Sequence, residues 1–389
     1  MKKSLILHIG MFKTGTSSIQ ETLYNSHEIL REKNVYYSSE LHPHNLTFFP
    51  IFYEEPELLP DWQKVYSKEQ ARKKQIELKK QWVREIVNNS YNTFIISSEN
   101  VSLWDEVTIK KAFNFIKIYF DEIKIIIYLR EHSSYFSSAI QQIVKNGFIN
   151  KDIHQILKEE IMFLNYKELI KKWVKVFGSK NIIVRKFDAT GFKNNDLIDD
   201  FFDSIGLGDI SSKQLNTVKA NESIGKNSII FLSELNKKYP VIINGTINEK
   251  RGLAKRYIPL EIFEAIQDEK FHLDIKYTQD EATYINEQVD FVNVFLPNNQ
   301  QFKHVEASDE ETVIPKPNEI PIEYFVELIN EYNKYLEKLI DQIEISNSQP
   351  TWERESCQRQ SHSSKKCYPP RRFNISLKRL FNALLKKFR

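Results

Sequence analysis

The segment of clearest chemical meaning is GMFKTGTSS, which runs from Gly10 to Ser18. Two glycines five residues apart, followed by hydroxyl side chains, are typical of loops that bind phosphate through backbone N–H groups. A loop for nucleoside triphosphates carries its lysine after the second glycine, where this chain has Thr16; its one lysine is Lys13. The segment therefore predicts a different anion-binding loop, with an ordinary strand–turn–helix as the alternative.

A second pair of phosphate ligands is predicted further along the chain. Arg130 directly follows an apolar run at 123–129, and Ser138 comes eight residues later, on a predicted helix. An arginine at the carboxyl end of a strand faces the ligand crevice of an open α/β sheet. Its planar guanidinium suits a phosphate group, and the serine adds a hydroxyl donor. Together with the loop, this pair predicts a ligand with two separated phosphate groups.

These two segments resemble known motifs of one enzyme family. HIGMFKTGTSS is similar to the 5′-phosphosulfate loop of sulfotransferases, and IIIYLREHSSYFSSAIQQIVKNG is similar to their 3′-phosphate motif. Phe12 replaces the usual proline and Ser17 replaces the second threonine of the loop. The similarity extends weakly to about residue 225, through Phe187-Asp188, the run DFFDSIGL and Asn221-Glu222-Ser223.

The resemblance implies a sulfotransferase that uses 3′-phosphoadenosine 5′-phosphosulfate (PAPS) and no metal, of the bacterial, carbohydrate-sulfating type. Lys13 would stabilise the charge that develops on the oxygen between phosphorus and sulfur. Arg130 and Ser138 would bind the 3′-phosphate. The 5′-phosphate would be held by Thr14, Gly15, Thr16, Ser17 and Ser18.

The acceptor hydroxyl needs a general base, and two residues are candidates. Glu99 lies two residues beyond the predicted strand at 93–97. At this strand end, related sulfotransferases often place the base or its neighbour. His44 lies in a loop after the second strand, where some carbohydrate sulfotransferases place an acidic base. The alternatives are that Glu99 caps a helix beginning near Trp104, and that His42 and His44 are surface residues. Lys145 is a weaker candidate for contacting acceptor or cofactor, and a solvated helix face suits it better.

The elements that must position these residues alternate along the first half of the chain. Short apolar runs at 5–9, 34–38, 93–97, 123–129 and 181–186 predict strands, and the segments 16–24, 67–88, 106–120, 133–146 and 165–177 predict helices. This alternation predicts an α/β fold: a P-loop-like parallel sheet flanked by helices, with a mostly helical C-terminal part that includes a helix at 321–345. We expect a PAPS-binding core at 1–225, a helical extension at 226–350 that contributes to acceptor binding, and a basic tail at 351–389.

Charge and cysteine content limit the classes of function that the chain can have. The 389 residues carry a net charge of +3, but residues 351–389 alone carry 11 Lys+Arg and 2 Asp+Glu, so the first 350 residues are net negative. No nucleic-acid partner is expected for such a body. Both cysteines, Cys357 and Cys367, lie in the tail, which excludes a disulfide framework or cysteine zinc site in the body. With no apolar stretch long enough for a membrane span or signal peptide, a cytoplasmic location is expected.

The tail has the pattern of a membrane-surface helix. From Ser376 it reads SLKRLFNALLKKFR, with an apolar stripe at Leu377, Leu380, Phe381, Leu384, Leu385 and Phe388. Basic residues fill the remaining surface, which suits the interface of an anionic membrane at its inner face. Packing on the body or on a partner subunit is the alternative.

The expected acceptor is a glycan or glycolipid hydroxyl; a small phenol or a peptide tyrosine are the alternatives. Two other functions remain open from the sequence. One is a P-loop nucleotide kinase or NTPase. The other is a non-catalytic nucleotide-binding protein recruited to membranes.

Overall fold

The computed structural model describes residues 2–59, 62–63, 65–147, 151–218, 224–240, 242–243, 246–248, 260–266 and 268–348. The chain forms two compact units, and neither is one continuous stretch of sequence. The first comprises Met1–Ala139, Glu159–Glu222 and Asp274–Thr312; the second comprises Ile140–Lys158, Ser223–Leu273 and Val313–Arg389. The expected division at residue 225 stays a prediction.

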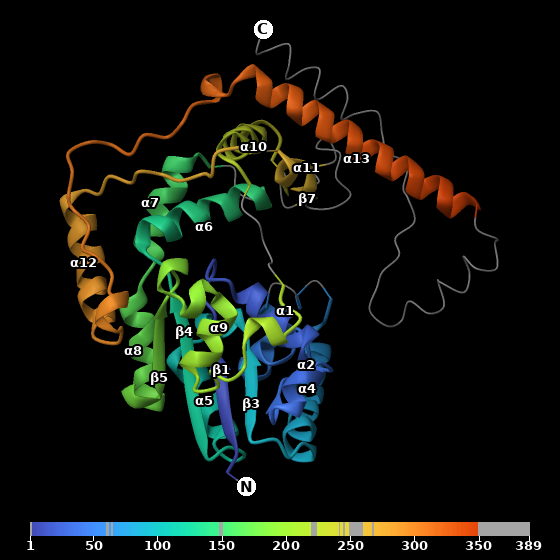
Figure 1. The fold of residues 1–389 in the computed structure, drawn as a ribbon, viewed down its shortest axis with the longest axis vertical. Helices are drawn as coiled ribbons and strands as arrows, with labels where there is room; N and C mark the ends of the chain where they lie inside the picture. The colour runs from blue at the N-terminus through green and yellow to red at the C-terminus, as the bar shows by residue number, and fades with distance from the viewer. Residues whose placement is uncertain are drawn as a thin grey trace. The chain divides into compact units, whose positions relative to one another are not determined.

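The first unit is built on a parallel sheet of five strands in the order β2-β3-β1-β4-β5. The strands are β1 Ser4–His8, β2 Val35–Tyr36, β3 Thr93–Ser97, β4 Glu122–Leu129 and β5 Ile182–Lys186. Figure 1 shows β3, β1, β4 and β5 side by side. His8 pairs with Ser97 and with Ile126, so the carboxyl ends of these strands lie at one edge. The predicted α/β fold with a parallel sheet is confirmed.

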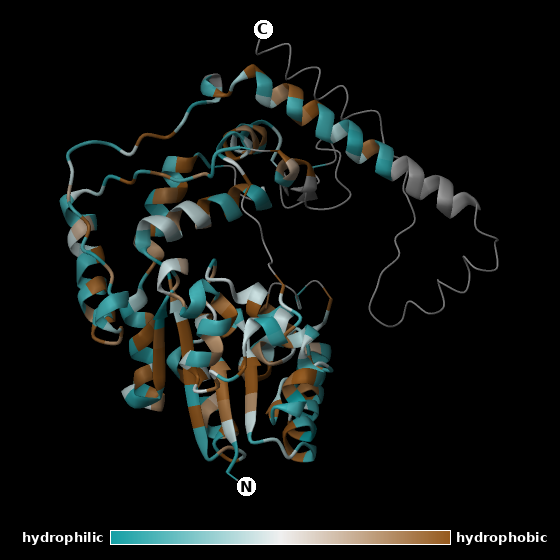
Figure 2. Ribbon diagram, viewed as in Figure 1, coloured by the Kyte–Doolittle hydropathy of each residue, from teal (hydrophilic) through white to brown (hydrophobic). Residues whose placement is uncertain are grey.

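Both faces of this sheet are buried, which explains why its strands read as continuous apolar runs. One face, with Ile6, Ile95 and Ile126, packs in a core with residues of α1 (Thr16–Asn25), α2 (His27–Glu32) and α9 (Leu197–Ser204). Successive residues of a strand point to opposite faces, so Leu5 and Leu7, both 0% exposed, lie on the other one. The strands are brown over most of their length in Figure 2.

Helices follow the strands as the sequence predicts, and side chains cap several of them. The remaining helices of this unit include α3 His44–Thr47, α4 Lys68–Asn88, α5 Glu106–Ile116, α6 His132–Asn146, α7 Ile153–Phe163, α8 Tyr166–Phe177 and α12 Gln279–Asn293. Helix α6 ends in the second unit, and α7 begins there. Ser67 and Gln70 form a capping box at the start of α4, and Asn165 caps α8. Helix α5 ends earlier than predicted because the next residues turn back to the sheet, where Asp121 N donates to Lys3 O at 2.8 Å.

The second unit is mostly helical, as expected, with a short hairpin that the sequence did not predict. It contains α10 Lys226–Lys238, β6 Ile242–Ile243, β7 Thr246–Ile247, α11 Leu260–Ala265 and α13 Ile322–Ser348. Asp268 accepts hydrogen bonds from the backbone N–H groups of Asn227 and Ser228 at the start of α10. In the described ranges, no helix is long and apolar enough to cross a membrane. The predicted tail helix lies outside these ranges.

Candidate active site

Residues 10–15, the phosphate loop that the sequence predicts, join β1 to α1 and are held in an unusual backbone conformation. Lys13 has a φ of 66° and Gly15 a φ of 72°. The left-handed region costs a non-glycine residue such as Lys13 roughly 1–2 kcal/mol. At Gly15 a Cβ atom would lie 2.4 Å from Leu197 Cδ2 and 2.9 Å from Phe187 Cε2. Glycine therefore suits this position, since any other side chain would meet Leu197 and Phe187 in addition to the cost of the positive φ.

The hydroxyl groups inside the loop bond to the loop itself. Thr14 Oγ1 and Thr16 Oγ1, both buried, donate to Met11 O at 2.7 and 3.1 Å. Both hydroxyl groups thus point to Met11 O in this structure, and the binding of a 5′-phosphate by Thr14 and Thr16 stays a prediction. No side chain in the described ranges caps α1 at Gly15. The start of α1 thus presents N–H groups and the positive end of the helix dipole.

Arg130 reaches this loop from the end of β4. Its Nη1 donates to Lys13 O at 3.1 Å, and its Nε donates to Ser134 Oγ at 2.7 Å. The guanidinium carbon lies 5.6 Å from the centre of the Phe187 ring, within the range of a cation–π contact. The structure thus brings together the two segments in which the sequence predicts phosphate ligands.

Ser134 is a candidate phosphate ligand that the sequence analysis missed. It lies four residues before Ser138 on α6, so the two serines share one face of the helix. Ser138 is buried, with 8% exposed surface. Glu131 accepts hydrogen bonds from the backbone N–H groups of Ser133 and Ser134, which fixes the first turn of α6 beside Arg130. The repeated serines of the segment HSSYFSSA were the available signal.

Glu99 lies two residues after the end of β3, at the start of a 3₁₀ turn, Glu99–Leu103. Burial raises the pKa of its carboxyl group to about 7, while the positive charge of Lys13 opposes this shift. Glu99 is therefore within electrostatic range of Lys13, and its pKa suits a general base near neutral pH. The alternative that Glu99 caps a helix near Trp104 is wrong. Helix α5 begins at Glu106 and is capped by Asp105, whose Oδ1 accepts from Thr108 N at 2.7 Å.

His44 is fully buried, so the expectation of a surface loop is wrong for this residue. Ser97 N donates to His44 Nδ1 at 3.2 Å, which makes Nε2 the protonated nitrogen that bonds to Ser38 O at 3.1 Å. Burial lowers the pKa of the ring to about 3. Both nitrogens are thus committed to the backbone, and the geometry gives His44 no free lone pair for an acceptor proton.

Two further residues, His42 and the weaker candidate Lys145, lie in surroundings that the sequence did not predict. The His42 side chain is only 11% exposed, with its ring stacked 4.3 Å from that of Tyr24. Lys145, expected on a solvated helix face, is 10% exposed and lies 3.7 Å from the Glu264 carboxylate in the second unit. Lys145 therefore belongs to an ion pair, which corrects the solvated-face interpretation.

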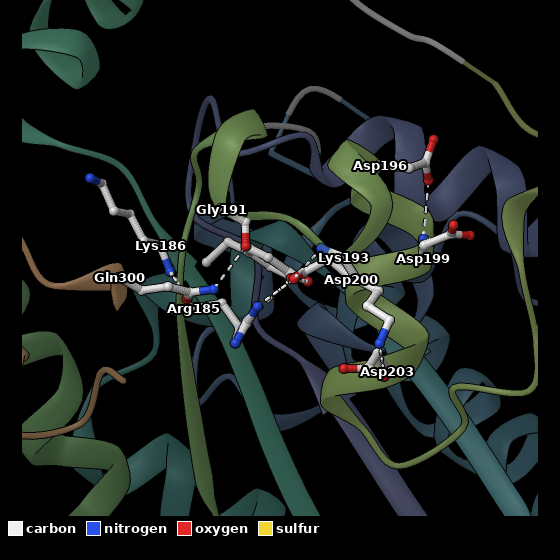
Figure 3. Close-up of polar contacts among 10 residues, drawn as sticks. Arg185, Lys186, Gly191, Lys193, Asp196, Asp199, Asp200, Asp203 and Gln300 are labelled. Carbon is white, nitrogen blue, oxygen red and sulfur yellow. Dashed lines mark hydrogen bonds and ion pairs between the residues drawn. The ribbon is translucent and has the colours of Figure 1, made fainter. Parts of the chain in front are cut away.

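A buried network positions the residues that cover the loop (Figure 3). Asp200, 1% exposed, accepts hydrogen bonds from Tyr128 Oη at 2.8 Å and Lys193 N at 3.1 Å, and it pairs with Arg185. These bonds fasten α9 to β4 and β5. Leu197, the first residue of α9, is thereby placed against Gly15.

A second set of bonds in the same view secures the segment after β5. Gln300 is almost fully buried, and its Nε2 donates to Gly191 O at 3.0 Å. Its Oε1 accepts from Lys186 N at 3.5 Å. Residues 274–312 are thus tied to the edge of the sheet that carries Phe187.

The fold and the loop define a class: a parallel α/β unit with a glycine-containing loop between its central strand and the first helix. No family model matches the chain. An uncharacterised protein from Archaeoglobus fulgidus is 28% identical over 115 residues, which cover 30% of this chain and 31% of that protein. The match thus spans about a third of that relative's length.

Two solved structures share part of the fold. The sulfotransferase from Alicyclobacillus acidocaldarius aligns with 61% of this chain and 95% of its own, at 12% identity and a TM-score of 0.34. The sulfotransferase domain from the curacin biosynthetic pathway aligns with 57% of this chain and 79% of its own, at 10% identity and a TM-score of 0.31.

Proposed function

We propose that the chain is a PAPS-dependent sulfotransferase. The observation that carries this proposal is the hydrogen bond from Arg130 Nη1 to Lys13 O, at 3.1 Å. It means that an arginine suited to one phosphate group lies beside a loop suited to another. A nucleotide with a 5′-phosphosulfate and a 3′-phosphate has two anionic groups that such a site can bind together.

The residues present fit this donor. The start of α1 offers backbone N–H groups to the 5′-phosphate, together with the half-buried hydroxyl residues Ser17 and Ser18. Arg130, Ser134 and Ser138 form the site for the 3′-phosphate. A guanidinium has five N–H donors, and the structure assigns one to Lys13 O and one to Ser134 Oγ. Among the residues that the structure describes, no other hydrogen bond uses the remaining three donors, which we propose bind an anion.

The reaction requires one group to stabilise the leaving oxygen and one to accept a proton. The sulfur–oxygen bond to the donor's 5′-phosphate breaks, and a new sulfur–oxygen bond forms with the acceptor hydroxyl. The ammonium of Lys13 stabilises the negative charge on the leaving phosphate oxygen. Glu99, within range of Lys13 and with a pKa of about 7, accepts the hydroxyl proton. The products are a sulfate ester and adenosine 3′,5′-bisphosphate.

The acceptor that we propose is a glycan or glycolipid hydroxyl. The membrane-type pattern of residues 376–389 supports a lipid-linked acceptor, because it would confine enzyme and acceptor to one surface. The chemistry itself requires only a hydroxyl group.

The proposal is tested by transfer of ³⁵S from labelled PAPS to glycan and lipid extracts, separated by chromatography. The expected result is a labelled product with the wild-type chain and none with Lys13→Ala. The Arg130→Ala variant should also need a much higher PAPS concentration to reach the same rate. Labelling that is equal with wild type and Lys13→Ala would contradict the proposal.

A further inference from the structure

The hydrogen bond between Arg130 and Lys13 joins two parts of the site with different tasks. We infer that Arg130 positions Lys13, so that the donor's 3′-phosphate accelerates transfer as well as adding affinity. This inference rests on the proposed function and extends it. Arg130 is in this respect a positioning residue, because it acts on the leaving oxygen through Lys13.

The backbone of Lys13 needs such support. Its φ of 66° lies in a region that a lysine rarely adopts, and such conformations persist only where the surroundings hold them. The Lys13 carbonyl accepts the Arg130 bond at 3.1 Å, and Gly15, two residues on, is closely covered by Leu197 and Phe187. The direction of the Lys13 side chain follows from this backbone conformation. A change in the Arg130 bond therefore changes where the ammonium points.

Three groups besides Lys13 contact Arg130. Ser134 holds its Nε at 2.7 Å, the ring of Phe187 lies against its guanidinium, and Tyr166 Oη donates to its backbone oxygen at 2.8 Å. The guanidinium is planar, so binding an anion with its remaining donors restricts the whole group. An anion bound there thus favours the orientation that also holds Lys13 O.

This coupling predicts that the rate of transfer at saturating donor concentration depends on whether the donor has a 3′-phosphate. Adenosine 5′-phosphosulfate can occupy the loop, but it has no 3′-phosphate to restrict Arg130. Lys13 is then aligned with the leaving oxygen for a smaller fraction of the time. Misalignment of a reacting group by about 1 Å can cost roughly 100-fold in rate.

The test measures release of ³⁵S-sulfate to water from PAPS and from adenosine 5′-phosphosulfate, each at saturation, so that no acceptor is needed. Wild type should release sulfate roughly 10- to 100-fold faster from PAPS. In Arg130→Met the two saturated rates should agree within about twofold. Equal saturated rates in wild type, or a rate ratio that survives in Arg130→Met, would overturn the inference. The wild-type comparison decides even if the variant fails to fold.

Calorimetric titration with adenosine 3′,5′-bisphosphate separates this inference from the proposed function. Binding of the bisphosphate with equal saturated rates would overturn only the role of Arg130 in positioning Lys13. No binding and no sulfate release from either donor would overturn both.

Discussion

Lys13 and Glu99 carry opposite charges in one partly buried site, and each affects the other. Burial favours the protonated form of Glu99, while the Lys13 ammonium favours the carboxylate. The balance leaves the pKa of Glu99 at about 7. In the proposed reaction, Lys13 therefore serves two purposes: it stabilises the leaving oxygen and keeps Glu99 partly ionised at neutral pH.

Lys13→Ala should abolish transfer while leaving the fold intact. Removal of one preorganised charge-stabilising group costs about 10²- to 10³-fold in turnover. Steady-state ³⁵S transfer measures this loss, and circular dichroism checks the fold. Lys33→Ala is the control, since Lys33 is an exposed lysine at the end of α2. A Lys13 variant that turns over as fast as the Lys33 variant would remove Lys13 from the mechanism.

Glu99→Gln should slow the chemical step by about 10²- to 10⁴-fold with little change in donor affinity. A base must be deprotonated, so the wild-type rate should rise with pH through a midpoint near 7, the pKa of Glu99. The pH profile of single-turnover transfer measures this limb. Glu32→Gln, an exposed carboxyl in α2, should keep the full profile. An unchanged acidic limb in Glu99→Gln would assign the base elsewhere.

Stability should follow the opposite trend with pH. The folded pKa of Glu99 lies above its ordinary value of 4.5, so the folded state retains the proton more strongly than the unfolded chain. The stability from this group is complete below about pH 4.5 and is lost as pH rises through 7. Wild type should thus lose more thermal stability over this window than Glu99→Gln.

At the scale of elements, the phosphate loop depends on α9 and on the end of β5. Leu197 and Phe187 leave no room for a side chain at Gly15. The buried hydrogen bonds and ion pair of Asp200 hold α9 and β5 in place. Neither of these two elements touches the reacting groups in the proposed reaction. We therefore expect the packing of Leu197 and Phe187 against Gly15 to affect phosphate binding by the loop.

Gly15→Ala should impair both stability and binding of adenosine 3′,5′-bisphosphate. Gly206→Ala is a matched control, because Gly206 also has a positive φ, of 83°, but no atom lies within 4 Å of the added Cβ. The control should lose only the conformational cost, roughly 1–2 kcal/mol, and retain binding. Thermal unfolding and calorimetry measure the two effects. Equal losses in both variants would show that packing at Gly15 is unimportant.

The sequence predicted the elements that depend on local pattern. The strands β1, β3, β4 and β5 are short apolar runs. The loop after β1 is marked by two glycines five residues apart, Gly10 and Gly15. Parallel topology then brings Lys13, Glu99 and Arg130 to one edge of the sheet. The sequence could not predict the burial of His44 or the ion pair of Lys145, because both depend on segments distant in the chain. Ser134 was missed because only the folded helix shows which serine faces Arg130.

At the scale of the whole molecule, charge is unevenly distributed. The first 350 residues are net negative, whereas residues 351–389 carry 11 basic and 2 acidic residues. We expect residues 351–389 to bind an anionic membrane surface, at about 1 kcal/mol for each well-placed lysine or arginine. Co-sedimentation with vesicles of anionic lipid should pellet the full chain but not a version ending at residue 350. Equal sedimentation of both, or none of either, would contradict this expectation.

The central claim is that the site recognises a nucleotide by its 3′-phosphate and without metal. It is tested most directly by titrating the full chain with adenosine 3′,5′-bisphosphate, adenosine 5′-phosphate and ATP, with EDTA or with magnesium. The bisphosphate should bind in EDTA roughly 10- to 100-fold more tightly than the monophosphate, as expected for hydrogen bonds to a charged group. Arg130→Ala should abolish that preference. Magnesium-dependent binding of ATP that exceeds binding of the bisphosphate, or equal affinity for the bisphosphate and the monophosphate, would contradict the claim.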